Sequence, residues 1–270
     1  MSAALARLTA FLAAWPDVAL VEVGEAKGST PREAGAWMLV SPGAILGTIG
    51  GGQLEFMAID RARAMIAART PEHEVLDVPL GPQIGQCCGG HVKVEIALAD
   101  GGLRAAVLER IEREEGKRPH VFIFGGGHVG HALSDALSLL PLAVAIVETR
   151  ADQIGDLPQG VEARLVAVPA ETVRAAPPAS AFLVLTHDHA LDFLIVAEAL
   201  RRADASYVGM IGSKTKRATF ASWYRKEAGG DEAGLARLVC PIGGAAVKDK
   251  RPAVIAAMAA AEVMRALSAP

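Results

Sequence analysis

The sequence predicts an α/β protein: a doubly wound parallel sheet in the C-terminal half, preceded by a smaller α+β domain. From residue 120 onward, apolar strand-like runs alternate with helical patterns, and this order favours a parallel sheet covered by helices. One run, residues 121–124, leads into Gly125, Gly127 and Gly130, a G-x-G-x-x-G pattern followed by apolar residues at helical spacing. Hydrophobic residues make up 51% of the chain and aromatic residues only 4%, which is typical of Ala- and Val-rich packing.

The chain opens with a predicted helix within residues 1–15, because Leu5, Leu8, Leu12 and Trp15 fall on one helical face. Arg7 interrupts this apolar stretch and no basic segment precedes it, so the pattern argues against a signal sequence. We expect a soluble, cytoplasmic protein.

Three polar, glycine-rich loops separate the elements expected next. The predicted strands cover residues 18–24, 36–40, 74–78 and 92–98, and a helix covers residues 54–69. The loops lie at residues 27–35, 47–55 (overlapping the start of the helix) and 81–90. The first half is therefore predicted to be an α+β unit.

A domain boundary is predicted at the charged, Gly- and Pro-containing segment 115–119, which follows a helix over residues 103–114. The expected domains are residues 1–115 and 119–270. In the second domain, strands are predicted at residues 120–124, 142–147, 163–168, 181–186 and 206–211. A last helix is predicted at residues 252–267, with Pro252 at its first position.

Charge and composition exclude several classes of function. A formal net charge of -3 and a pI near 6.2 leave no broad basic surface, which argues against nucleic acid. No apolar stretch is long enough to span a membrane. Three cysteines without C-x-x-C spacing predict neither a disulfide framework nor structural zinc.

The glycine turn predicts a site for a phosphate-bearing ligand. Gly125, Gly127 and Gly130 allow a tight turn and a close approach, and a helix N-terminus supplies N–H donors. Glu148 closes the following strand, where an acidic residue holds the ribose of a dinucleotide, and Arg150 offers a phosphate contact instead. A solvated strand end is the alternative. His128 within the turn is unusual for an NAD site.

The segment His187, Asp188 and His189 follows the fourth strand of this sheet, where it is expected to line the ligand crevice. It also resembles part of a metallohydrolase motif, but the histidine that would end the motif is absent. Asp192 is expected to cap the next helix.

Basic residues begin the helix after the fifth strand. Ser213 is the predicted cap, and Lys214 and Arg217 oppose the helix dipole, which favours an anionic ligand there. A solvated basic surface explains the same residues equally well.

In the first half, Gly50, Gly51 and Gly52 precede a helix and form a potential anion nest. Arg32 offers a bidentate fork to a phosphate or a carbonyl-rich ring. Cys88 is followed by two glycines in a polar loop, which favours a thiolate ligand or a sulfur-handling thiol over a buried apolar thiol.

Taken together and in order, these motifs resemble the XdhC/CoxI family over nearly the whole chain. The N-terminal matches are Ser29-Thr30-Pro31-Arg32, Gly35 to Val40, Gly47 to Gly52 with Glu55, and Cys88-Gly89-Gly90. The C-terminal matches are Phe124 to Gly130, Thr186 to His189, Val208 to Lys214 and Pro241-Ile242-Gly243. The segment after Gly243 departs from the family pattern, because no Glu follows Pro252.

The resemblance implies a Rossmann-like C-terminal domain and a maturation factor rather than an enzyme. It implies binding of the molybdenum cofactor in its molybdopterin form, protection of its sulfurated form, and delivery to the molybdenum-binding subunit of xanthine dehydrogenase. A cysteine desulfurase is the expected sulfur donor, and a homodimer is expected. The expected cofactor-binding residues are Ser29, Arg32, Gly50, Gly51, Gly52, Glu55, Cys88, Gly125, Gly127, His128, Gly130, Glu148, Arg150, His187, Asp188, His189, Ser213 and Lys214, with Cys88 also contacting molybdenum.

Two other functions compete with this interpretation. An NAD(P)-dependent oxidoreductase would select its cofactor through Glu148 or Arg150 and move a proton through His187 or His189. A metal-dependent hydrolase would use His187, Asp188 and His189, but the sequence offers no fourth ligand.

Overall fold

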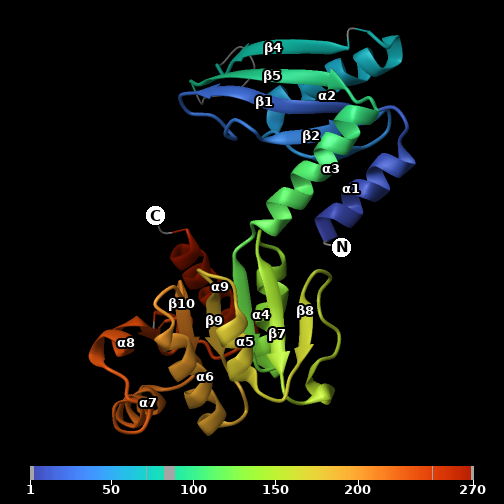
Figure 1. Ribbon diagram of the computed structural model, residues 1–270. Coiled ribbons are helices and arrows are strands. Elements are labelled where there is room, and N and C mark those ends of the chain that lie inside the picture. The colour runs from blue at the N-terminus through green and yellow to red at the C-terminus, as the bar shows by residue number, and fades with distance from the viewer. Residues whose placement is uncertain (1–2, 71, 82–88, 245, 269–270) are drawn as a thin grey trace. The chain divides into compact units, whose positions relative to one another are not determined.

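The computed structural model describes residues 3–70, 72–81, 89–244 and 246–268, and the chain forms two compact units (Figure 1). They comprise Met1–Glu114 and Glu115–Pro270, so the division falls at the charged segment where the sequence predicts a boundary.

The N-terminal unit is built on a five-stranded antiparallel sheet with the strand order β3-β2-β1-β5-β4. Its strands are β1 (Ala19–Lys27), β2 (Trp37–Val40), β3 (Ile45–Gly47), β4 (His73–Pro79) and β5 (His91–Leu98), and its helices are α1 (Ala3–Ala14), α2 (Gly52–Ala68) and α3 (Gly101–Gly116). Because β1 and β2 are joined through the loop 28–36, the polar segment around Arg32 lies at one end of neighbouring strands.

Helices cover the two faces of this sheet differently. Successive side chains of a strand point to opposite faces. Val21 and Met38 therefore pack with α2 in one core, whereas Leu39 packs with α1 and α3 in a second cluster. Leu8 of α1 is buried in that second cluster, which confirms the amphipathic helix expected at the N-terminus.

The C-terminal unit is built on a six-stranded sheet in which every neighbouring pair of strands is parallel. The strands are β6 (His120–Phe124), β7 (Ala143–Glu148), β8 (Glu162–Leu165), β9 (Ala181–Val184), β10 (Tyr207–Met210) and β11 (Leu238–Val239). The helices are α4 (His128–Ser138), η2 (Ala151–Gln153), α5 (Pro169–Ala175), α6 (His189–Arg201), α7 (Lys214–Lys226), α8 (Glu232–Arg237) and α9 (Pro252–Leu267). The strand order is β11-β10-β9-β6-β7-β8. When β6 is numbered as the first strand, this is the 3-2-1-4-5-6 order of dinucleotide-binding sheets. In that order the chain adds strands on one side of β6 first and then on the other side, so the switch point lies between β6 and β9.

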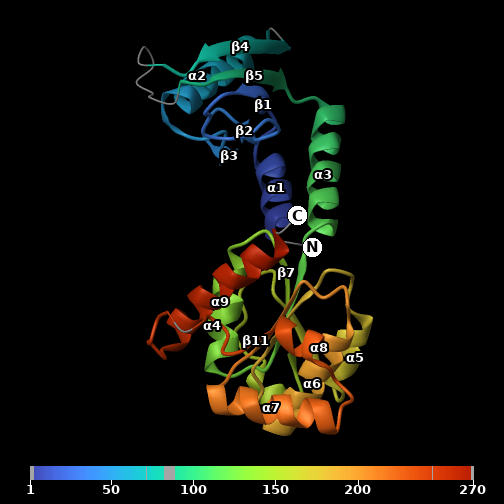
Figure 2. The ribbon, with the colours of Figure 1, turned by 90° about the vertical axis from the view of Figure 1, so that its left-hand side faces the viewer.

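Helices cover both faces of the parallel sheet, as Figure 2 shows. On β6, Phe122 and Phe124 belong to the core shared with α5 and α6. Val121 and Ile123 belong to the opposite core, shared with α4 and α9. The predicted doubly wound α/β class and the preceding α+β unit are confirmed.

The differences from the predicted elements concern short segments. The sequence did not predict β3, α8 or β11, because elements of three, six and two residues are too short to show a hydrophobic period. β8 ends at Leu165, before the predicted residue 168. Within the described ranges, none of the helices has the length and apolar character that a membrane crossing needs.

Candidate functional site

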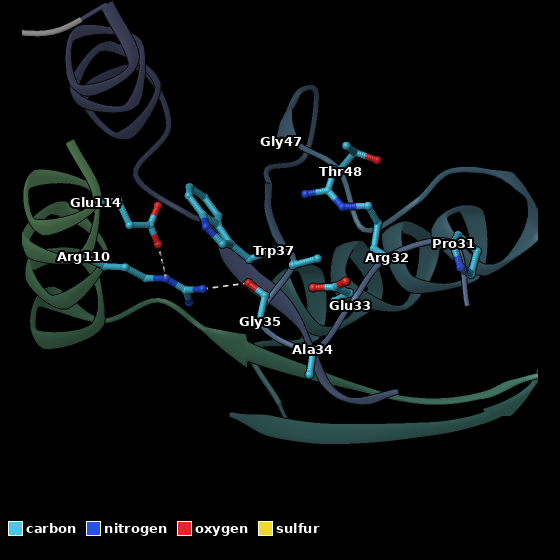
Figure 3. A pocket seen from close by; sticks show the side chains of 11 residues that line it. Pro31, Arg32, Glu33, Ala34, Gly35, Trp37, Gly47, Thr48, Arg110 and Glu114 are labelled. Carbon is cyan, nitrogen blue, oxygen red and sulfur yellow. Dashed lines mark hydrogen bonds and ion pairs between the residues drawn. The ribbon is translucent and has the colours of Figure 1, made fainter. Parts of the chain in front are cut away.

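Two of the glycine-rich loops of the N-terminal unit contribute the walls of one polar pocket with a volume of about 690 Å³ (Figure 3). It is lined by Pro31, Arg32, Glu33, Ala34, Gly35, Ala36, Trp37, Gly47, Thr48, Arg110 and Glu114. Residues 31–36 come from the loop between β1 and β2, Trp37 begins β2, and Arg110 and Glu114 come from α3. The sequence singled out Arg32 for this purpose, and the pocket places it at the wall.

Close packing between glycines and their neighbours gathers the loops next to this pocket. A Cβ on Gly50 would lie closer than 3.0 Å to Pro31, and one on Gly90 would overlap the carbonyl group of Ser29. Only glycine permits these approaches. The structure thus brings Ser29, Arg32, Gly50 and the end of the third loop together, although the sequence separates them widely.

Glu55 fills the nest that the sequence predicts at Gly50 to Gly52. Its carboxylate accepts hydrogen bonds from the backbone N–H of Ile49 at 3.0 Å and of Gly51 at 3.1 Å, and from the Thr48 hydroxyl. Partial burial raises the pKa of Glu55, but these hydrogen bonds outweigh it and hold the pKa below its usual range. Glu55 therefore acts as an internal anion that shapes the loop beside the pocket.

Two arginines line the pocket in different ways. Arg110 reaches Glu22 at 2.8 Å and the Gly35 carbonyl oxygen at 2.7 Å, and its guanidinium lies over the Trp37 ring. Arg32 is exposed and forms no hydrogen bond or ion pair within the described residues. Arg32 is therefore available to an anionic ligand, whereas Arg110 fixes the loop. The sequence missed Arg110 because it is one charge among many on α3.

Cys88, the expected thiolate ligand, lies outside the described residues. Gly89 and Gly90, which follow it, are described: the N–H of Gly89 donates to the Leu80 carbonyl oxygen at 2.9 Å, and Gly90 packs against Ser29. The described end of the third loop is thus fixed beside the loop that carries Arg32.

In the C-terminal unit, the glycines of the turn between β6 and α4 have two different roles. A Cβ on Gly125 would overlap Leu185, and one on Gly130 would overlap the Gly125 carbonyl oxygen. A Cβ on Gly127 would meet no atom of the described residues within 4 Å. Gly125 and Gly130 are therefore required by packing, and Gly127 borders open space at the start of α4. His128 beside it is exposed.

Glu148 lies at the end of β7 and is buried against this turn. Its carboxylate accepts from the backbone N–H groups of Gly126 at 2.9 Å, Thr149 at 2.7 Å and Arg150 at 3.1 Å, and from the Arg150 side chain at 3.4 Å. Burial raises the pKa of Glu148, but these donors outweigh it and lower the pKa to about 2. Since a carboxylate has about four lone-pair positions, little capacity is left for a ribose.

Replacing Glu148 should lower stability in a pH-dependent way. In Glu148→Gln an amide NH₂ faces backbone N–H groups, and we expect a loss of about 1–3 kcal/mol at pH 7. A depressed carboxyl pKa contributes stability above the ordinary value of 4.5, and this contribution disappears as the pH falls toward 2. Urea unfolding at pH values from 7 to 3 should show that the difference in unfolding free energy between Glu148→Gln and the wild type becomes smaller below about pH 4.5. The control Glu227→Gln, at an exposed position, should show no such difference at any of these pH values. A gap independent of pH would contradict this role.

The prediction that Asp192 caps the helix after β9 is wrong, and Asp192 instead holds the segment that follows β9. Asp188, not Asp192, caps α6, and it accepts from the Ala190 N–H at 2.8 Å. Asp192 is completely buried: it accepts from the backbone N–H and the hydroxyl of Thr186 and pairs with Lys216 of α7. His187 and His189 are exposed on the same segment. No cluster of three metal-binding side chains occurs among the residues described.

At the start of α7, the predicted cap is confirmed, and the basic residues differ in whether they have internal partners. The Ser213 hydroxyl accepts from the Lys216 N–H at 3.2 Å. Lys216 pairs with Asp192, and Arg217 donates to the Leu238 carbonyl oxygen at 2.6 Å, so both have internal partners. Of the basic residues 214–217, Lys214 alone is exposed without a side-chain partner in the described part of the chain.

Both units match models of known protein families. The XdhC Rossmann domain matches residues 121–263, and the XdhC and CoxI family matches residues 12–78. The uncharacterized protein YqeB of Escherichia coli K12 is 26% identical over 236 residues, which are 83% of this chain but only 39% of that protein. The chain therefore spans well under half of that relative's length.

A solved structure shares the fold of the chain. It is a Bacillus halodurans protein described as a xanthine dehydrogenase, with a TM-score of 0.78, 19% identity, and coverage of 100% of this chain and 98% of that one. At this identity the likeness establishes the fold alone. The family match covers more than half of the chain, in the order that the sequence motifs indicate, and the chain therefore belongs to the XdhC/CoxI family.

Proposed function

We propose that this protein binds the molybdenum cofactor in its molybdopterin form, protects its sulfurated form and delivers it to apo xanthine dehydrogenase. Membership of the XdhC/CoxI family supports a role related to the maturation of xanthine dehydrogenase. The finer proposal depends on one observation, the polar pocket of about 690 Å³ beside the gathered loops of the N-terminal unit. That volume lies in the range of small-molecule sites.

The residues at this pocket fit a pterin that carries a phosphate. The Arg32 guanidinium, which has no partner within the described residues, offers planar paired donors that suit a phosphate or a pterin carbonyl. Arg110 holds the Gly35 carbonyl and so fixes the loop that presents Arg32. When bound, the cofactor supplies the molybdenum centre that the recipient enzyme needs, and the residues of this chain bind and orient it.

The remaining parts of the proposal concern partners and residues outside the pocket. The molybdenum-binding subunit of xanthine dehydrogenase is the proposed recipient, a cysteine desulfurase the sulfur donor, and Cys88 a contact to molybdenum. The protein is proposed to act as a cytoplasmic homodimer without enzymatic turnover. Gly127 and the start of α4 form the second proposed phosphate contact, because Gly127 borders open space.

Changing Arg32 tests the proposal in cells. When xanthine dehydrogenase is co-expressed with Arg32→Ala, its activity and molybdenum content should fall about tenfold, because a charge-assisted contact to the cofactor is lost. Arg7→Ala is the matched control, since Arg7 is also exposed and forms no ion pair within the described residues. Unchanged activity with Arg32→Ala would remove Arg32 from the site. Cys88→Ser should likewise lower the activity.

An NAD(P)-dependent oxidoreductase is the second candidate, and the 3-2-1-4-5-6 strand order favours it. The internal hydrogen bonds of Glu148 weigh against it, because the ribose would have to displace Gly126 or Arg150 from that carboxylate. Titration of the protein with NADH and NADPH separates the two functions. Tight binding together with turnover of the reduced cofactor would support the oxidoreductase.

A further inference from the structure

A second cavity, with a volume of about 670 Å³, lies entirely in the C-terminal unit, and of its lining residues only Ser213 belongs to the cofactor-binding residues expected from the sequence. It opens where β10 ends, between the start of α7 and the first half of α9. Residues 241–244 and 247–250 form one of its walls, and the sequence assigns no role to the part of this wall after Gly243. The lining residues are Ile211, Gly212, Ser213, Pro241, Ile242, Gly243, Gly244, Val247, Lys248, Asp249, Lys250, Val254, Ile255 and Met258.

The wall formed by residues 241–244 is fixed to the unit by its backbone. The N–H of Ile242 donates to the Met210 carbonyl oxygen at 3.3 Å, and the N–H of Gly243 donates to Glu262 at 2.8 Å. Gly243 and Gly244 have φ values of +76° and +69°, which glycine adopts readily. A Cβ on Gly243 would press against Met258 at 3.1 Å. These contacts hold the segment against α9 and define the cavity.

The inner surface of this cavity is apolar. Val254, Ile255 and Met258 lie on successive turns at the start of α9, and Ile211 and Ile242 face them from the strand ends. Val247, with 43% of its surface exposed, extends this apolar surface along the segment. Ligand sites of this size are lined mostly by apolar side chains, with a few polar groups that set specificity.

The charged residues of the cavity are positive on balance. Asp249, the only acidic residue among the described residues of the lining, is bound by Arg251 through its Nε at 2.9 Å and its Nη2 at 2.6 Å. This guanidinium, together with the Arg251 backbone N–H, lowers the pKa of Asp249. Lys248 and Lys250 are exposed and form no ion pair within the described residues. Two cations without partners therefore border an apolar cavity.

We infer that this cavity is a binding site for a small organic anion with an apolar body, such as an aryl or acyl carboxylate, sulfonate or phosphate ester. The apolar body lies against Val254, Ile255 and Met258, where its burial drives binding. The anionic group lies toward Lys248 and Lys250, and it accounts for selectivity against neutral molecules. The site shares no residue with the N-terminal pocket or with the glycine turn.

Two fluorescent probes with the same ring system test this assignment on the full chain. One is 8-anilinonaphthalene-1-sulfonate, and the other is N-phenyl-1-naphthylamine, which lacks the sulfonate. The double substitution Lys248→Gln and Lys250→Gln should raise the Kd of the sulfonate about fivefold or more, because two exposed ion pairs are lost. The Kd of the neutral probe should stay within about twofold. Val254→Trp should raise the Kd of both probes, because the larger side chain fills the cavity.

Matched variants keep the test decisive. Lys117→Gln with Lys226→Gln removes two exposed positive charges elsewhere on the unit and should leave both Kd values unchanged. If Val254→Trp fails to fold, Val247→Asp at the exposed rim provides the second test. Its added negative charge should raise the Kd of the sulfonate probe but not that of the neutral probe. Failure of the sulfonate to bind, an equal loss for both probes in the lysine variant, or full binding to Val254→Trp or Val247→Asp would overturn the assignment.

Discussion

Gly130→Ala should unfold the C-terminal unit, whereas Gly127→Ala, three positions earlier in the same turn, should leave it folded. A Cβ on Gly130 would overlap the Gly125 carbonyl oxygen, which is backbone and cannot rotate away, so α4 would have to move from β6. We expect a loss of more than about 4 kcal/mol, since forced overlap in a core belongs to the most damaging class of substitution. Thermal unfolding followed by circular dichroism measures this difference.

The Gly127→Ala control separates packing from ligand binding. Gly127 has a φ of -75°, and its added Cβ would have no neighbour within 4 Å in the part of the chain that the structure describes, so stability should change by no more than about 1 kcal/mol. The added methyl group would nevertheless face the space in which a phosphate approaches the start of α4. Equal stability of the two variants would show that the turn is not packed as described.

Lys216→Met should destabilise the protein by about 3–5 kcal/mol, because it leaves the Asp192 carboxylate buried without its cation. Methionine keeps most of the aliphatic stem, which packs against Gly212, so the lost charge dominates the effect. Urea unfolding compares this variant with Lys214→Met, an exposed neighbour whose replacement should cost no more than about 0.5 kcal/mol.

A second substitution tests the cause of this loss. Adding Asp192→Asn to Lys216→Met removes the buried charge, so the double variant should be more stable than Lys216→Met alone. The Thr186 N–H and hydroxyl would still find an acceptor in the amide oxygen. A double variant that is less stable than the single one would contradict the charge argument.

The fold was predictable from the sequence wherever a hydrophobic pattern was long or a turn was distinctive. The strand at 120–124 and the helix at 252–267 have the predicted bounds, because a buried apolar run and a proline at the first helical turn mark them. Short elements such as β3 and β11 depend on pairing with neighbouring strands, and no local pattern records that pairing.

The candidate sites were predictable in part, because residue type suggests chemistry but not partners. Arg32 lines a pocket, as its motif suggests, and Gly127 borders open space. Glu55 and Glu148, in contrast, are occupied by backbone N–H groups of the glycine turns beside them. The roles of Asp192 and Lys216 could not be found in advance, since residues on two helices meet only after the sheet has formed.

The most direct test of the proposed function is anaerobic purification of this protein from a host that makes molybdopterin, followed by assay of bound molybdenum and of the fluorescent pterin released on oxidation. The proposal predicts molybdenum and pterin in near-equal amounts, close to one per chain, and loss of both in Arg32→Ala but not in Arg7→Ala. Purified protein without pterin or molybdenum, under conditions in which xanthine dehydrogenase in the same cells acquires its cofactor, would contradict it.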